Sequence, residues 1–101
     1  EIRVMGANEY RALGETPQDA AEKIKEKIDL LGDESFTKRT EGINAWRESP
    51  LYQLYLSIGQ QSMVQGVDVN VVSLQLHQEG KPYLTQEEFM AIADLNHQLR
   101  Y

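Results

Sequence analysis

The sequence contains no cysteine, no long apolar run and few basic residues. Without cysteine, the chain can form no disulfide, no thiolate metal site and no thiol nucleophile. No stretch of about 20 apolar residues is present, so no membrane-spanning helix is predicted. The opening residues, Glu1 to Val4, lead into no apolar signal-peptide core, so no secretory signal is predicted and the compartment stays open.

Acidic residues outnumber basic ones, 16 Asp and Glu against 10 Lys and Arg, for a formal net charge of −6. This balance disfavours nucleic acid or an anionic membrane as the main partner. The length of 101 residues, with 41% hydrophobic and 26% charged residues, predicts one soluble globular domain over residues 1–101. Because position 1 is Glu rather than Met, we expect the chain to be a fragment of a longer protein.

The clearest helix start is Thr16-Pro17, which combines an N-cap hydroxyl with proline at the first helical position. Apolar residues then recur at helical spacing as far as Leu31, and Gly32 is expected to end the helix. The segment therefore predicts an amphipathic helix that covers a core with one of its faces.

Two later segments begin in a similar way. Ser49-Pro50 precedes apolar residues at positions i, i+3, i+4 and i+7, which predicts an amphipathic helix that ends at Gly66. Thr85 and Glu88 have the spacing of a capping box, which predicts the start of a helix near the end of the chain.

Two other segments favour strands. Residues 2–5, a turn and residues 10–13 predict a hairpin, with a single helical turn as the alternative for the second segment. Residues 67–76 predict the strongest strand, although their apolar alternation changes face between Val71 and Val72. A β-bulge at that point would explain the change, and so would a central strand that is covered on both sides.

The segment 33–48 is ambiguous. Its apolar spacing suits a helix, whereas residues 35–40 alternate as an edge strand would, and we favour helical structure around residues 43–48. Together the elements predict an α/β or α+β domain, in which three or four helices cover a small three-stranded sheet (two to four strands).

The segment Leu13–Ala20, with the sequence LGETPQDA, resembles a strand-to-helix turn of many small α/β proteins, including HicB-like antitoxin domains. This short stretch is explained by helix capping alone. No family and no function are inferred from it.

No pattern for catalysis or cofactor binding is present. The sequence has neither a Gly-rich phosphate loop nor a nucleophile elbow. His77 and Glu79 offer two donors near the end of a predicted strand, whereas a metal site needs three or four ligands. His97 lies near a helix C-terminus, where a cation interacts favourably with the helix dipole. We therefore predict a protein that is not an enzyme and that has no cofactor, metal or catalytic site.

The most informative pattern is a gap in the charges. No charged residue occurs between Ser49 and Val67, and Asp68 is the only one between Leu51 and Gln78. An ordinary surface helix carries Lys and Glu on its outer side, whereas interface centres are depleted of charge and enriched in aromatic residues and Met. Burial within the monomer and burial in an interface both explain the gap, and we favour the interface. The predicted interface residues are Trp46, Arg47, Leu51, Tyr52, Tyr55, Gln61 and Met63.

The leading hypothesis is a non-catalytic protein–protein interaction domain that self-associates as a homodimer, as a structural or accessory component of a larger assembly. One alternative is an enzyme or ligand-binding fragment whose site uses His77, Glu79 and Arg47. Another is a nucleic-acid-contacting module with a local basic patch. The residues of that patch would be Arg3, Arg11, Lys38, Arg39 and Arg47. No membrane is expected among the partners.

Overall fold

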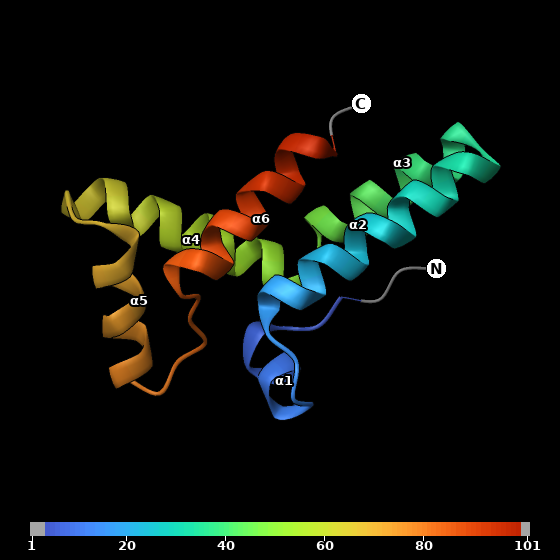
Figure 1. Cartoon of the computed structure of the whole chain (residues 1–101). Coiled ribbons are helices and arrows are strands. Elements are labelled where there is room, and N and C mark those ends of the chain that lie inside the picture. The colour runs from blue at the N-terminus through green and yellow to red at the C-terminus, as the bar shows by residue number, and fades with distance from the viewer. Residues whose placement is uncertain (1–3, 100–101) are drawn as a thin grey trace.

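The computed structural model describes residues 4–99, and its regular structure consists of α-helices alone (Figure 1). The helices are α1 (Ala7–Ala12), α2 (Pro17–Glu34), α3 (Phe36–Arg47), α4 (Pro50–Gln65), α5 (Val69–Gln78) and α6 (Gln86–Gln98). They account for 78% of the structure, and no strand occurs among residues 4–99. The predicted α/β or α+β class, with its three-stranded sheet, is therefore wrong.

Two helical hairpins lie on either side of α6 (Figure 1). Helix α2 packs against α3 and α6, while α4 packs against α5 and also contacts α6. The short helix α1 contacts both α2 and α4. The radius of gyration is 13.9 Å, against about 13 Å for a compact chain of 100 residues. The molecule is elongated, 43 × 29 × 19 Å, and the α4–α5 hairpin forms one of its ends (Figure 1).

The segment predicted as an N-terminal hairpin is helical in its second half. Helix α1 replaces the expected strand 10–13, and of the expected strand 2–5 only residues 4 and 5 are described, which form no strand. Ala7 and Tyr10 lie three residues apart and are both buried, so a helix directs both toward the core. Leu13 caps the C-terminus of α1. The segment Leu13–Ala20 therefore follows a helix, and not a strand as its resemblance to small α/β proteins implies.

Helix α2 begins as predicted and ends later than predicted. The hydroxyl of Thr16 accepts a hydrogen bond of 3.1 Å from the backbone N–H of Asp19. The helix then continues through Gly32 to Glu34. A Cβ atom at Gly32 would lie 3.0 Å from the Cδ atom of Arg39. This glycine therefore permits a close approach of α3 instead of ending α2.

Helix α3 resolves the ambiguous segment 33–48. The helical interpretation around residues 43–48 is confirmed and extends back to Phe36, and the edge-strand alternative for residues 35–40 is wrong. Ser35 ends α2, and its side chain accepts a hydrogen bond of 3.0 Å from the backbone N–H of Lys38. One residue thus terminates one helix and caps the next.

The predicted strand 67–76 is also wrong, because most of it lies in α5. Val72 and Ser73 are buried, and Val69 and Leu76 are partly buried, so positions i, i+3, i+4 and i+7 face the core. The change of face after Val71, which a strand explains only with a β-bulge or with cover on both sides, follows directly from the helical repeat. Valine lowers helix propensity by only about 0.5 kcal/mol per residue, less than the burial of one such side chain contributes.

Helices α4 and α6 confirm their predicted starts. Ser49 accepts a hydrogen bond of 3.2 Å from the backbone N–H of Tyr52, and α4 ends at Gly66 in the left-handed conformation, with φ of 67°. The side chains of Thr85 and Glu88 form a complete capping box, with hydrogen bonds of 3.2 and 2.9 Å. These boundaries depend on local chemistry, which explains why they are readable in the sequence.

Candidate interaction surface

One face of α4 is buried and the opposite face exposes apolar side chains. Leu51 and Ile58 lie seven residues apart on one side of the helix and are fully buried. Leu56 and Met63, also seven residues apart, are 44% and 85% exposed. Helix α4 therefore presents apolar side chains both to the core and to solvent.

Helix α5 continues this exposed apolar character. Val71 and Leu74 are 41% and 57% exposed, and Val64, in the last turn of α4, is 80% exposed. These side chains lie away from the inner face of α5, where Val72 is fully buried. The term "hairpin surface" denotes five exposed apolar residues: Leu56, Met63, Val64, Val71 and Leu74.

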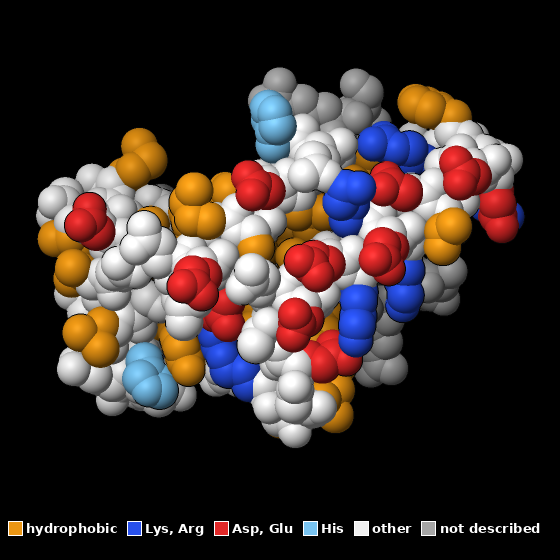
Figure 2. Space-filling view, viewed as in Figure 1, with side chains coloured by type: hydrophobic (Ala, Val, Ile, Leu, Met, Phe, Trp, Pro, Cys, Tyr) orange, Lys and Arg blue, Asp and Glu red, His pale blue; other side chains and the backbone are white. Residues whose placement is uncertain are grey.

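The hairpin surface lies in the uncharged part of the molecule. Asp68 is the only Asp, Glu, Lys or Arg between Glu48 and Glu79. The five ion pairs among residues 4–99 all use side chains outside α4 and α5. In Figure 2, acidic and basic side chains crowd the part formed by α2 and α6, while the α4–α5 end carries hydrophobic and uncharged side chains with a single acidic group.

Exposed ion pairs shift pKa values on the charged part of the surface. A hydrogen bond and the opposite charge of Lys38 hold the pKa of Glu34 below its ordinary value, and Glu34 in turn raises the pKa of Lys38. A hydrogen bond to Glu15 likewise raises the pKa of Lys23. The Glu34–Lys38 pair thus stabilises the fold above the ordinary glutamate pKa, and this contribution is lost as the pH falls through the lowered pKa.

Two of the predicted interface residues belong to the core. Trp46 and Leu51 are 1% and 0% exposed. The indole N–H of Trp46 donates a hydrogen bond of 2.7 Å to Asn96 Oδ1, and its ring meets that of Tyr52 edge-on, with centroids 5.5 Å apart. Trp46 and Leu51 therefore hold the helices together and are not available to a partner in this structure.

The other predicted interface residues divide between the core margin and the surface. Tyr55 is half-buried, and its ring stacks on that of Phe89 with centroids 4.6 Å apart. Gln61 donates a hydrogen bond of 3.0 Å to the Ser57 hydroxyl on the same helix. Arg47 is exposed at the end of α3. Of the seven predicted interface residues, Met63 is the one that belongs to the hairpin surface.

Sequence reasoning missed four members of the hairpin surface. Leu56 and Val64 were detectable, because they fall opposite the apolar stripe that predicts α4. Val71 and Leu74 were hidden by the strand prediction, since a strand and a helix assign different residues to the exposed face.

The structure gives the enzyme hypothesis no common site. The ring of His77 packs on Tyr83 with centroids 4.4 Å apart, while Glu79 forms an ion pair of 3.1 Å with Lys81. Neither residue lines the groove beside α6 or the smaller pocket between α5 and α6, and the same holds for Arg47. Within residues 4–99, no three His, Asp or Glu side chains are grouped as metal ligands.

The basic residues of the nucleic-acid hypothesis are dispersed or already paired. Arg3 lies outside the described residues. Arg11, on α1, binds Glu88, and Lys38, on α3, binds Glu34. The side chain of Arg39 packs against Gly32 of α2. Arg11 thus lies on a different helix from Lys38, Arg39 and Arg47, which share α3, and carboxylates offset the charges of Arg11 and Lys38.

Comparison of the chain with protein families, curated proteins and solved structures gave no match. Within the described part of the chain, every helix is too short or too polar to cross a membrane. The surface of this chain and its charges are therefore the features that bear on function.

Proposed function

We propose that this chain is a non-catalytic interaction domain that self-associates as a homodimer through the hairpin surface. The observation that carries the proposal is the set of exposed apolar side chains on the uncharged α4–α5 end, above all Met63 and Val64. Exposed apolar side chains that gather on one uncharged end of a domain suit an interaction site. Such a domain suits a structural or accessory component of a larger assembly.

Charge favours a second copy of the chain as the occupant of this surface. Each copy carries a net charge of −6, so most pairings of two copies bring acidic groups together. A twofold interface places the same patch against itself, so a patch that lacks charges brings few like charges together. Between Glu48 and Glu79 only Asp68 would suffer this repulsion.

A dimer interface on the α4–α5 hairpin would also draw on neighbouring residues. A standard interface uses about 20–30 residues on each side, whereas some residues of α4 and α5, such as Leu51, Ile58 and Val72, are buried in the core. Such an interface buries about 800 Å² per partner, roughly an eighth of the 6327 Å² of accessible surface of this chain.

Sedimentation velocity from low micromolar to several hundred micromolar protein tests the proposal. We expect a concentration-dependent dimer, and we expect Met63→Glu to leave a folded monomer, because it places a carboxylate in an apolar interface. The matched control is Leu30→Glu, which adds the same charge at a residue on α2 that is 66% exposed. This control should dimerise as the unaltered chain does.

Two results would overturn the proposal: a monomer over the whole concentration range, or equal loss of the dimer in Met63→Glu and Leu30→Glu. Circular dichroism of each variant confirms that its helices are retained. Tyr55→Arg is unsuitable for this test, because Tyr55 stacks on Phe89 and its loss would disturb the core.

A further inference from the structure

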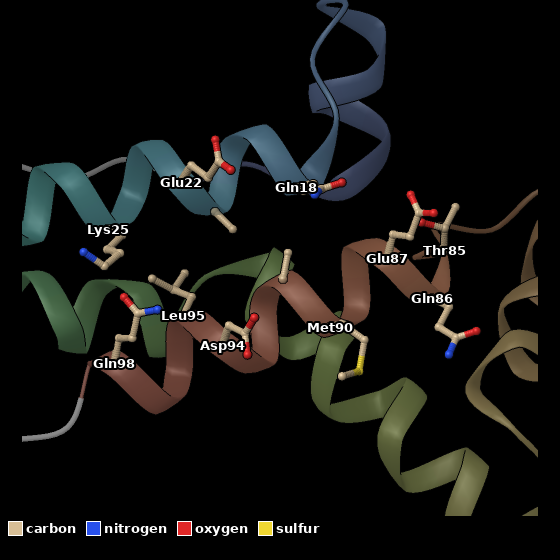
Figure 3. A pocket seen from close by; sticks show the side chains of 12 residues that line it. Gln18, Glu22, Lys25, Thr85, Gln86, Glu87, Met90, Asp94, Leu95 and Gln98 are labelled. Atoms are coloured by element: carbon tan, nitrogen blue, oxygen red, sulfur yellow. The ribbon is translucent and has the colours of Figure 1, made fainter.

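An open groove of about 880 Å³ runs between α2 and α6 on the charged part of the molecule (Figure 3). Its base includes Ala21 and Leu95, which are each 3% exposed, together with Ala91. The small side chains of Ala21 and Ala91 leave space between the two helices. Met90 adds an apolar side chain that is 53% exposed. Met90 thus supplies the accessible apolar surface of the groove, above a base of side chains that are already largely buried.

Carboxylates line the groove from both helices. Glu22 lies on α2, and Glu87 and Asp94 lie on α6. Within residues 4–99, none of these three carboxylates has a hydrogen bond or ion pair. The cation in the lining is Lys25, which forms an ion pair of 2.8 Å with Asp29. The lining therefore carries three carboxylates and one ammonium group, a formal net charge of −2.

We propose that this groove binds a cationic amphipathic helix of a partner protein. Along α6 the lining extends from Gln86 to Gln98, about 18 Å at 1.5 Å per residue, which matches about three turns of a docked helix. The apolar side chains of such a helix would pack on Leu95 and Met90. Its Lys or Arg residues at i, i+3, i+4 and i+7 would reach the carboxylates on the walls.

The charges disfavour α2 and α6 of a second copy as occupants. Both helices are net acidic, so either one would bring carboxylates against Glu22, Glu87 and Asp94. A free metal ion is also a poor fit, because no grouped set of three ligands occurs among residues 4–99. A cationic helix satisfies both the apolar base and the acidic walls.

The test uses a synthetic amidated peptide of 14 residues, LKKLLKLLKKLLKL, whose leucines and lysines occupy opposite faces of a helix. Its affinity for the chain is measured by isothermal titration calorimetry. In the triple variant Glu22→Gln, Glu87→Gln and Asp94→Asn we expect a loss of about tenfold, since three partly exposed ion pairs are removed. All three residues are exposed, so the fold should not change.

The matched control neutralises three exposed acidic residues outside the groove: Glu26→Gln, Asp33→Asn and Glu41→Gln. It changes the net charge by the same amount, and we expect a loss of less than about twofold because these residues lie outside the binding groove. Met90→Gln tests the apolar contact without any change in charge, and we expect it to weaken binding about threefold.

Three outcomes would overturn the proposal. The first is equal loss of affinity in the groove variant and the control, which would indicate attraction by net charge alone. The second is equal binding of a lysine homopeptide with the same charge, which would show that the apolar base makes no contribution. The third is no binding of the leucine–lysine peptide. Repeating the titration with Met63→Glu separates this result from dimer formation.

Discussion

At the scale of single residues, Arg11 joins α1 to a segment that lies more than 70 residues away in sequence. Its guanidinium donates hydrogen bonds to the backbone carbonyl of Tyr83, at 2.9 Å, and to the carboxylate of Glu88. The same group lies 3.9 Å from the centre of the Tyr83 ring. Glu88 also closes the capping box with Thr85. Arg11 thus ties α1 to the start of α6 and to the loop before it.

Removal of this guanidinium should destabilise the fold strongly. Arg11→Met keeps the apolar stem but leaves the side chain of Glu88, which is 8% exposed, without its cation. We expect a loss of about 2–3 kcal/mol in the free energy of unfolding. Urea denaturation followed by circular dichroism measures this loss.

The control for that experiment is Lys38→Met. Lys38 pairs with Glu34 on the surface, where both side chains are more than half exposed, so solvent weakens their attraction. We expect no resolvable shift of its urea midpoint. A comparable destabilisation by both substitutions would show that burial of the Arg11–Glu88 pair adds nothing to its contribution.

At the scale of elements, two glycines of α4 should respond to alanine in opposite directions. Gly66 ends the helix with φ of 67°, where a Cβ atom is strained, so Gly66→Ala should cost about 1 kcal/mol of stability. Gly59 lies inside the helix, and a Cβ atom there would lie 3.7 Å from Phe89 Cζ, an ordinary contact. Gly59→Ala should therefore stabilise by about 0.5–1 kcal/mol.

Thermal or urea unfolding of the two variants measures this difference. The same sign for both would contradict the assigned end of α4. The two variants can be compared directly because each substitution adds one methyl group, either within α4 or at its C-cap.

The helices also show which kinds of secondary structure can be predicted from the sequence and which cannot. Helix starts with a capping hydroxyl, such as Ser49 and Thr85, were predicted correctly because the cap bonds to an amide three residues away. The structure of residues 67–76 was predicted wrongly, because the spacing of their apolar side chains fits both a bulged strand and a helix. The neighbours of α5 decide between the two by burying the face that contains Val72.

At the scale of the whole molecule, the two proposed interactions should depend on salt in opposite ways. Dimerisation brings together two chains of charge −6 through an uncharged surface, so salt should strengthen it by screening repulsion. Binding of a cationic helix in the acidic groove should weaken with salt instead. The Debye length falls from about 30 Å at 0.01 M salt to about 8 Å at 0.15 M salt. This change in screening is large enough to reveal both effects.

Sedimentation and calorimetry at these two salt concentrations test this prediction. A dimer that dissociates as salt rises would point to an interface held by ion pairs rather than by the hairpin surface. Peptide binding that does not change with salt would contradict a role for Glu22, Glu87 and Asp94.

The sequence alone determined the starts of α2, α4 and α6, the acidic net charge and the uncharged segment after Ser49, because each is read from the residue types or from residues close together in the chain. The tertiary structure decided which side of that segment is core: it buries Trp46 and Leu51 and leaves Met63 and Val64 in solvent. It also decided that α5 is a helix and that α2 and α6 enclose an acidic groove. These features depend on which helices meet, and contacts between distant segments set that outcome, since local propensity differs between the alternatives by less than the packing energy.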